Sequence, residues 1–264
     1  MPLYQLTSSS LVQISSTSFQ DENLRERQDL QRLLKHNISV ISPDTLVIAE
    51  EFGDFSDSNR RIDLLAIDKN ANLVVIELKR TGDGGHMELQ AIRYASMVAN
   101  MTWDQAVFAY RRYLQAHETE LDAESSLLEF LGWDQPQEDV FGQNVRMILA
   151  SGDFSKEITT SVLWLNERDL DITCVRLGLY RSGDQLLLNA EQIIPLPEAE
   201  GYQVEVRQKR REERSSRTGT RDRSVLTLSI NGEPFRSRFK KSDIGLNTVL
   251  AAMFRLSVES YQPS

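Results

Sequence analysis

Three charged residues stand inside two strongly apolar segments of the chain. Asp63 lies near the start of one segment, and Glu77 and Lys79 lie two residues apart near the end of the next. Side chains alternate along a β-strand, so Glu77 and Lys79 would project to the same face. If the segments pair as a hairpin, Asp63 can lie beside them. Such a group could hold a divalent metal ion and act on a phosphodiester.

The apolar neighbours of this group predict that it is buried. Unpaired charges inside an α/β core are costly, so the three groups need a metal ion or one another. Two carboxylates suit Mg²⁺ or Mn²⁺, and the backbone carbonyl of Leu78 is a natural further ligand. Lys79 would orient the attacking water or neutralise developing charge. The predicted chemistry is metal-dependent phosphodiester hydrolysis.

Flanking segments offer further candidate site residues. Glu26 is four residues before Leu30 in a helical pattern and could point a carboxylate at the metal. Gln90 and Tyr94 are four apart on a predicted helix, so both could contact a phosphate or a metal-bound water. A further pair could guide phosphate or simply solvate a strand end: Arg60 and Arg61.

The elements that must position these residues alternate between helices and strands. Leucine spacing predicts a helix over 21–36 with Asp21 as its N-cap. Strands are expected at 45–50, 61–67 and 73–79, and the turn DKNAN at 68–72 would join the last two as an antiparallel hairpin. Helices at 86–101, 103–116, 123–131 and 156–166 and strands at 145–150, 171–180 and 185–194 follow. The predicted class is α/β, with an α-β-β-β-α-β mixed sheet flanked by helices.

The pattern also suggests how the chain divides. We expect an N-terminal extension at 1–20, a catalytic domain at 21–197, and a charged connector at 198–223 whose 207–223 part holds eight Lys or Arg against three acidic residues. A hairpin around the turn Asn231–Gly232 and a helix at 244–257 would form a small C-terminal α+β appendix at 224–264. The connector could be solvated or could contact phosphates non-specifically.

The composition limits the class of protein, its location and the metals it could bind. With 40% hydrophobic and 26% charged residues, the chain fits an ordinary globular protein without a membrane span, and its start lacks a secretory signal, so a cytoplasmic location is expected. The net charge of −9 disfavours a broadly basic nucleic-acid-binding surface. Cys174 is the only cysteine and the three histidines lack ligand spacing, which disfavours zinc; each histidine is expected at the surface or in a loop.

The motif set resembles the PD-(D/E)XK nuclease superfamily, and in particular its branch of RecB-type and NucS-like nucleases. The matching features are Asp63, the run Glu77-Leu78-Lys79, an upstream helical glutamate and the pair Gln90-x-x-x-Tyr94. The resemblance spans about 21–197. It implies a restriction-endonuclease-like fold and metal-dependent DNA cleavage, with Asp63, Glu77 and Leu78 as metal ligands and Lys79 as the catalytic lysine.

The chain departs from that family pattern in two places, and other interpretations stay open. Ile62 replaces the motif's proline, and only about twenty residues stand where NucS proteins carry a DNA-binding and dimerisation domain. The strand charges could instead form an exposed cross-strand ion pair. The expected partner is DNA, in repair or defence, with no membrane partner. An RNA nuclease, a non-catalytic nucleic-acid-binding protein and a homodimer all remain alternatives.

Overall fold

The computed structural model describes residues 2–53, 60–81, 86–197, 209, 226–230 and 233–239. The chain separates into two compact units, Met1–Val204 and Glu205–Ser264. Among the described residues, no helix is both long enough and apolar enough to cross a membrane.

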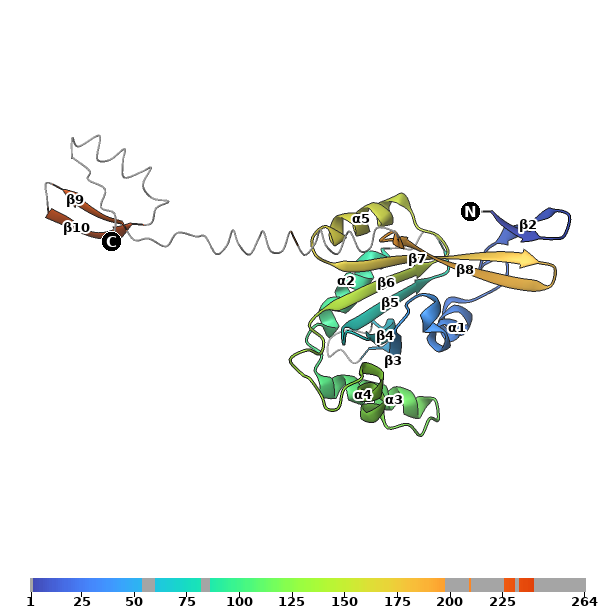
Figure 1. Cartoon of the computed structure of the whole chain (residues 1–264), viewed down its shortest axis with the longest axis horizontal. Coiled ribbons are helices and arrows are strands. Elements are labelled where there is room, and N and C mark those ends of the chain that lie inside the picture. Colours follow the sequence, from blue (N-terminus) through green and yellow to red (C-terminus); the bar gives the residue numbers. More distant parts are fainter. Residues whose placement is uncertain are drawn as a thin grey trace. The chain divides into compact units, whose positions relative to one another are not determined.

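The first unit is organised around an eight-stranded mixed sheet (Figure 1). Its order is β1-β2-β7-β6-β5-β4-β3, with β8 paired to β7. The β3–β4 and β4–β5 pairs are antiparallel, whereas β5–β6 and β6–β7 are parallel. The strands are β1 (Leu3–Leu6), β2 (Leu11–Thr17), β3 (Thr45–Phe52), β4 (Ile62–Asp68), β5 (Leu73–Lys79), β6 (Val145–Ser151), β7 (Asp171–Ser182) and β8 (Gln185–Ile194).

Helices cover both faces of this sheet and divide the core into two layers. One hydrophobic cluster lies between the sheet and α2 to α5, and the other lies between the sheet and the segment η1–α1. The predicted α/β class and its helix–strand order are confirmed. The helices are η1 (Glu26–Gln31, π-helical), α1 (Arg32–His36), η2 (Ile38–Val40, 3₁₀), α2 (Met87–Val98), α3 (Trp103–Ala116), α4 (Ala123–Leu131) and α5 (Lys156–Asn166).

The β4–β5 hairpin forms where the sequence predicts it. The side chain of Asp68 accepts hydrogen bonds from the backbone N–H groups of Asn70 and Asn72, at 2.9 and 3.0 Å, which closes the turn. Every residue of β4, and every residue of β5 except Lys79, is buried. This pair is therefore the rigid centre of the sheet.

The predicted helix start at Asp21 is wrong, because the helical segment begins at Glu26. Phe19 is buried in the core, and its carbonyl accepts a hydrogen bond from the N–H of Leu24 at 2.8 Å. Asn23 between them adopts a left-handed backbone with φ 55°. Burying Phe19 thus bends the chain into a turn and delays the helix by five residues, from 21 to 26.

The chain outside residues 21–197 contributes further structure. In the expected N-terminal extension, β1 pairs with β2, and β2 pairs with the second half of β7. In the second unit, β9 (Leu226–Ile230) and β10 (Glu233–Phe239) form an antiparallel pair where a hairpin is expected. The expected helix at 244–257, the loop at 82–85 and all of the connector except residue 209 lie outside the described residues.

Candidate active site

The register of the hairpin brings the strand charges together. Leu64 pairs with Ile76, so the next position of the same antiparallel register sets Asp63 opposite Glu77. Leu73 and Val75 of β5 belong to the core layer under α2, and Glu77 and Lys79 alternate in step with them. The group therefore faces α2.

Hydrogen bonds and ion pairs connect these residues but leave one carboxylate oxygen without a hydrogen-bond partner among the described residues. Asp63 Oδ2 accepts a hydrogen bond from the N–H of Leu78 at 2.8 Å, and Lys79 Nζ donates to Glu77 Oε1 at 2.7 Å. Glu77 is 2% exposed, and its Oε2 is buried without a hydrogen-bond partner among the described residues. A buried carboxylate oxygen with free lone pairs is suited to a cation.

Burial and neighbouring charges shift the pKa values of all three groups. Desolvation raises the pKa of Asp63 to about 6, and the hydrogen bond from Leu78 opposes the rise. Desolvation and the nearby charge of Asp63 raise the pKa of Glu77 to about 7. Burial works against the charged form of Lys79, but its pKa is raised overall because Glu77 is beside it. The lysine therefore keeps its proton at neutral pH.

The segment η1 reaches this group from the opposite face of the sheet. Glu26 Oε2 accepts from the N–H of Arg80 at 3.1 Å, and its Oε1 lies 3.7 Å from Lys79 Nζ. Gln31, which is buried, donates from Nε2 to the carbonyl of Asp63 at 3.1 Å. Gln31 was not predicted as a site residue, because its alignment with Glu26 depends on the wide π-helical turn, which the leucine spacing does not indicate.

Helix α2 supplies the two predicted polar residues. Gln90 and Tyr94 both line the same cavity as the strand charges. Gln90 Oε1 is buried and accepts no hydrogen bond among the described residues. Burial, followed by the charge of Glu77, raises the pKa of Tyr94. The phenol therefore stays protonated and can donate a hydrogen bond.

Nearly all predicted site residues line one cavity of about 310 Å³. Leu78 is fully buried in β5 and is not among the lining side chains. Arg27 lines the cavity but was not predicted; its position next to Glu26 is the only sequence signal. Four basic and three acidic side chains line it, so it is locally basic in a chain of net charge −9. The lining residues are Glu26, Arg27, Arg60, Arg61, Asp63, Glu77, Lys79, Gln90 and Tyr94.

The donor set fits a hard divalent cation. No group of three or more His, Cys, Asp or Glu side chains in the described part of the chain is arranged to hold a metal. Asp63 and Glu77 would therefore need the backbone carbonyl of Leu78, water and substrate oxygen to complete the shell. Mg²⁺ accepts such a mixed oxygen shell, because it retains several waters when bound through one or two carboxylates.

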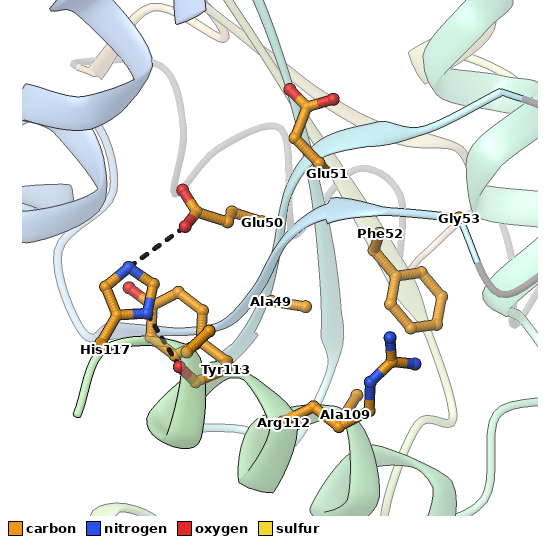
Figure 2. A pocket seen from close by; sticks show the side chains of 10 residues that line it. Ala49, Glu50, Glu51, Phe52, Gly53, Ala109, Arg112, Tyr113 and His117 are labelled. Atoms are coloured by element: carbon orange, nitrogen blue, oxygen red, sulfur yellow. Dashed lines mark hydrogen bonds and ion pairs between the residues drawn. The ribbon is translucent and has the colours of Figure 1, made fainter. Parts of the chain in front are cut away.

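A second pocket lies between β3 and α3 and shows a different kind of polar cluster (Figure 2). Lys35 Nζ lies 2.8 Å from both Glu50 Oε2 and His117 Nε2, and His117 Nδ1 bonds the carbonyl of Tyr113 at 2.8 Å. His117 lies in the turn that follows α3, as expected for a loop histidine, and is partly buried and paired there. These groups satisfy one another, unlike those of the first cavity.

Comparisons with known proteins find partial structural likeness. No family model matches the chain, and no curated protein does. A repair endonuclease from Pyrococcus abyssi superposes with TM-score 0.31 and 20% identity over 56% of this chain and 45% of that one. An EndoMS–double-stranded DNA complex gives TM-score 0.33 and 15% identity over 67% and 64%. This chain thus spans less than two thirds of the length of either protein.

Proposed function

We propose that this protein is a divalent-metal-dependent DNA endonuclease that hydrolyses phosphodiester bonds. The observation that carries the proposal is the cavity in which two buried carboxylates, a protonated lysine and two helix side chains converge. Asp63 and Glu77 have raised pKa values because they are desolvated, and Glu77 keeps an oxygen without a partner. A structural ion pair would have no physical reason to leave that oxygen unsatisfied.

Each residue has a role that follows from its position. Asp63, Glu77 and the Leu78 carbonyl would hold Mg²⁺ or Mn²⁺, which when bound polarises the phosphate and acidifies a water. Lys79 keeps its proton and can donate to the attacking water or to a phosphate oxygen. Glu26 holds the backbone of Arg80 in place just after Lys79.

The polar residues on α2 and the two arginines just before β4 would contact substrate. Gln90 and Tyr94 can both donate hydrogen bonds to phosphate oxygens across the cavity. Arg60 and Arg61 line the same cavity and add positive charge where a polyanion would enter. DNA is the proposed substrate class because the motif set resembles DNA nucleases, and DNA repair or defence against foreign DNA is the proposed setting. A homodimer would allow two such cavities to cut both strands.

The deciding experiment is cleavage of a panel of linear, single-stranded, branched and mismatched DNA, with RNA alongside, in Mg²⁺ or Mn²⁺. Wild type would be compared with Glu77→Ala and Lys79→Ala, and with Asp68→Asn as a control at the other end of β4. We expect metal-dependent cutting that is lost in the first two variants and kept in the control. Binding of nucleic acid without cleavage by any form would establish a non-catalytic binding protein instead, and cleavage of RNA alone would change the substrate class.

A further inference from the structure

Strand β3 contains an unusual backbone next to the cavity. Its register with β4 shifts between Val47 and Ala49, and Glu51 adopts a left-handed conformation with φ 48°. Glycine, asparagine and aspartate enter this region most readily, whereas a glutamate is uncommon there. A residue held in such a conformation points to a local requirement for its side chain.

Glu51 lies on the same face of the sheet as Asp63, although it lines the second pocket and not the cavity itself. Glu50 pairs with Leu64 and Phe52 with Ile62, so Glu51 lies opposite Asp63. Figure 2 shows Glu50 extending toward His117 and Glu51 extending away from it. The charge of Glu51 contributes to the raised pKa of Asp63, although desolvation is its main cause. Placing a fourth carboxylate beside Glu26, Asp63 and Glu77 is therefore unfavourable unless it binds a cationic group.

That cationic group is Arg27. Its Nε lies 3.0 Å from Glu51 Oε1, and neither carboxylate oxygen of Glu51 accepts a hydrogen bond among the described residues. The Arg27 side chain is 63% exposed and lines the cavity that holds Asp63 and Glu77. The ion pair thus holds a solvent-facing guanidinium beside the two carboxylates.

Most N–H donors of the Arg27 guanidinium are not used by Glu51. Arginine carries five N–H groups, of which four belong to the two terminal nitrogens, and Glu51 contacts the Nε end. A planar guanidinium matches two oxygens of a phosphate. Arg27 comes from η1, whereas Arg60 and Arg61 precede β4, so basic groups reach the cavity from two separate elements.

We propose that Arg27 binds a backbone phosphate of the DNA and that Glu51 is its positioning residue. This inference rests on the proposed function and adds a substrate contact to it. The bulge in β3 and the left-handed backbone of Glu51 orient its carboxylate toward Arg27. The carboxylate then fixes the guanidinium before DNA arrives, which reduces the entropy lost on binding.

The test measures binding of a labelled duplex to the full chain by fluorescence anisotropy in Ca²⁺ over a range of KCl, with cleavage kinetics in Mg²⁺. Arg27→Ala should weaken binding about tenfold, as expected for loss of a charged hydrogen bond. It should also reduce the slope of log affinity against log salt by about 0.9. Arg32→Ala is the matched control, because Arg32 is similarly exposed at 56%, is paired with Asp29 and does not line the cavity.

Glu51 is tested through its dependence on Arg27. Glu51→Gln should weaken binding about threefold and affect KM more than kcat, because the orientation of Arg27 is lost while the proposed metal ligands remain. In the Arg27→Ala background the same change should have no further effect. Glu51→Asn, which tolerates a left-handed backbone, provides a second variant that removes the charge without added strain.

The outcomes separate this inference from the proposed function. If wild type binds and cleaves DNA but Arg27→Ala keeps its affinity and salt slope, the phosphate contact is wrong and the nuclease stands. If the Glu51 variants lower affinity equally in both backgrounds, Glu51 acts on the fold and not through Arg27, which overturns its positioning role. If wild type neither binds nor cleaves DNA, both proposals fail together.

Discussion

The two ends of strand β4 each carry a buried aspartate, and the fold surrounds them differently. Asp68, 3% exposed, accepts hydrogen bonds from two backbone N–H groups of the turn and from Arg146 Nη1 at 2.9 Å. Asp63, 7% exposed, accepts one from Leu78, and desolvation raises its pKa to about 6. Asp68 is therefore well supplied with donors, whereas the end of the strand that holds Asp63, with its neighbour Glu77, is under-satisfied.

This difference separates structural charges from candidate site charges. At Asp68 the donors compensate for burial, so the charge stabilises the turn. Beside Asp63, Glu77 retains an oxygen without a hydrogen bond, and its pKa rises to about 7. Carboxylates in that state are costly until a cation arrives, which is the condition a metal site requires.

The largest expected effect is at the under-satisfied end. Glu77→Gln keeps the side chain's size but removes a proposed metal ligand, so metal-dependent cleavage should fall by more than about a hundredfold. The free energy of unfolding without metal should change by less than about 1 kcal/mol, because a costly buried charge is removed as well. Cleavage assays and chemical denaturation measure the two quantities. Full activity in this variant would contradict the assigned role.

The opposite result, a loss of stability without a loss of activity, is expected at Asp68. Asp68→Ala leaves Arg146 and the turn N–H groups without their acceptor, and should lower the free energy of unfolding by about 2–4 kcal/mol. Cleavage per folded molecule should stay within about twofold of wild type, because the cavity is at the other end of the strand. Denaturant titration and cleavage below the melting temperature would show this. A variant that is stable but inactive would contradict the structural role assigned to Asp68.

The raised pKa values predict how pH and metal act together. Asp63 and Glu77 keep protons in the folded state up to about pH 6 and 7, whereas the unfolded chain loses them near 3.8 and 4.5. The folded state therefore binds more protons in this window, and the metal-free protein should lose stability as pH rises from about 4 to 7.

Bound metal should offset that loss, since it binds the ionised carboxylates. Thermal unfolding should therefore show a rise in Tm with Mg²⁺ at pH 8 and little or none at pH 5. Glu77→Gln should reduce both the pH dependence and the Mg²⁺ effect, whereas Asp68→Asn should retain them. An equal rise in Tm at both pH values would indicate that Mg²⁺ binds elsewhere.

The smallest effect is expected at the edge of the cavity. A Cβ at Gly53 would lie 3.0 Å from Arg61 Cγ and 3.2 Å from the carbonyl of Arg60. Gly53→Ala should therefore displace this arginine pair slightly and weaken DNA binding about two- to threefold. Anisotropy titration with the same duplex would measure it. Unchanged affinity would contradict a substrate contact that depends on the placement of Arg60 and Arg61.

Much of the sheet and several helices could be predicted from local pattern. The bounds of β5, β8, α3, α4 and α5 match the expected ranges, because each has clear apolar periodicity and polar turns at its ends. Thr102 caps α3, and Ser155 caps α5. The helix start at Asp21 was wrong because burial of Phe19, a tertiary effect, overrides a good local capping residue.

Part of the candidate site could be predicted from the sequence for the same reason. Strand periodicity places Glu77 and Lys79 on one face, and helical periodicity places Gln90 and Tyr94 together, so these pairs follow from spacing. Gln31 and Glu51 do not, because their contacts depend on a π-helical turn and on a bulged strand. Neither irregularity has a signature in a single sequence.

The sequence by itself determined which residue types could do chemistry and which strands carry them, because alternation and apolar runs are local properties. Only the tertiary structure decided which charges are satisfied. Asp63 and Asp68 are equivalent by type and by strand. The turn beside Asp68 supplies local donors, but Arg146, and the one donor to Asp63, Leu78, come from other strands. Hydrogen bonding and desolvation act through space, and for this reason the assembled fold distinguishes the candidate active site from a structural turn.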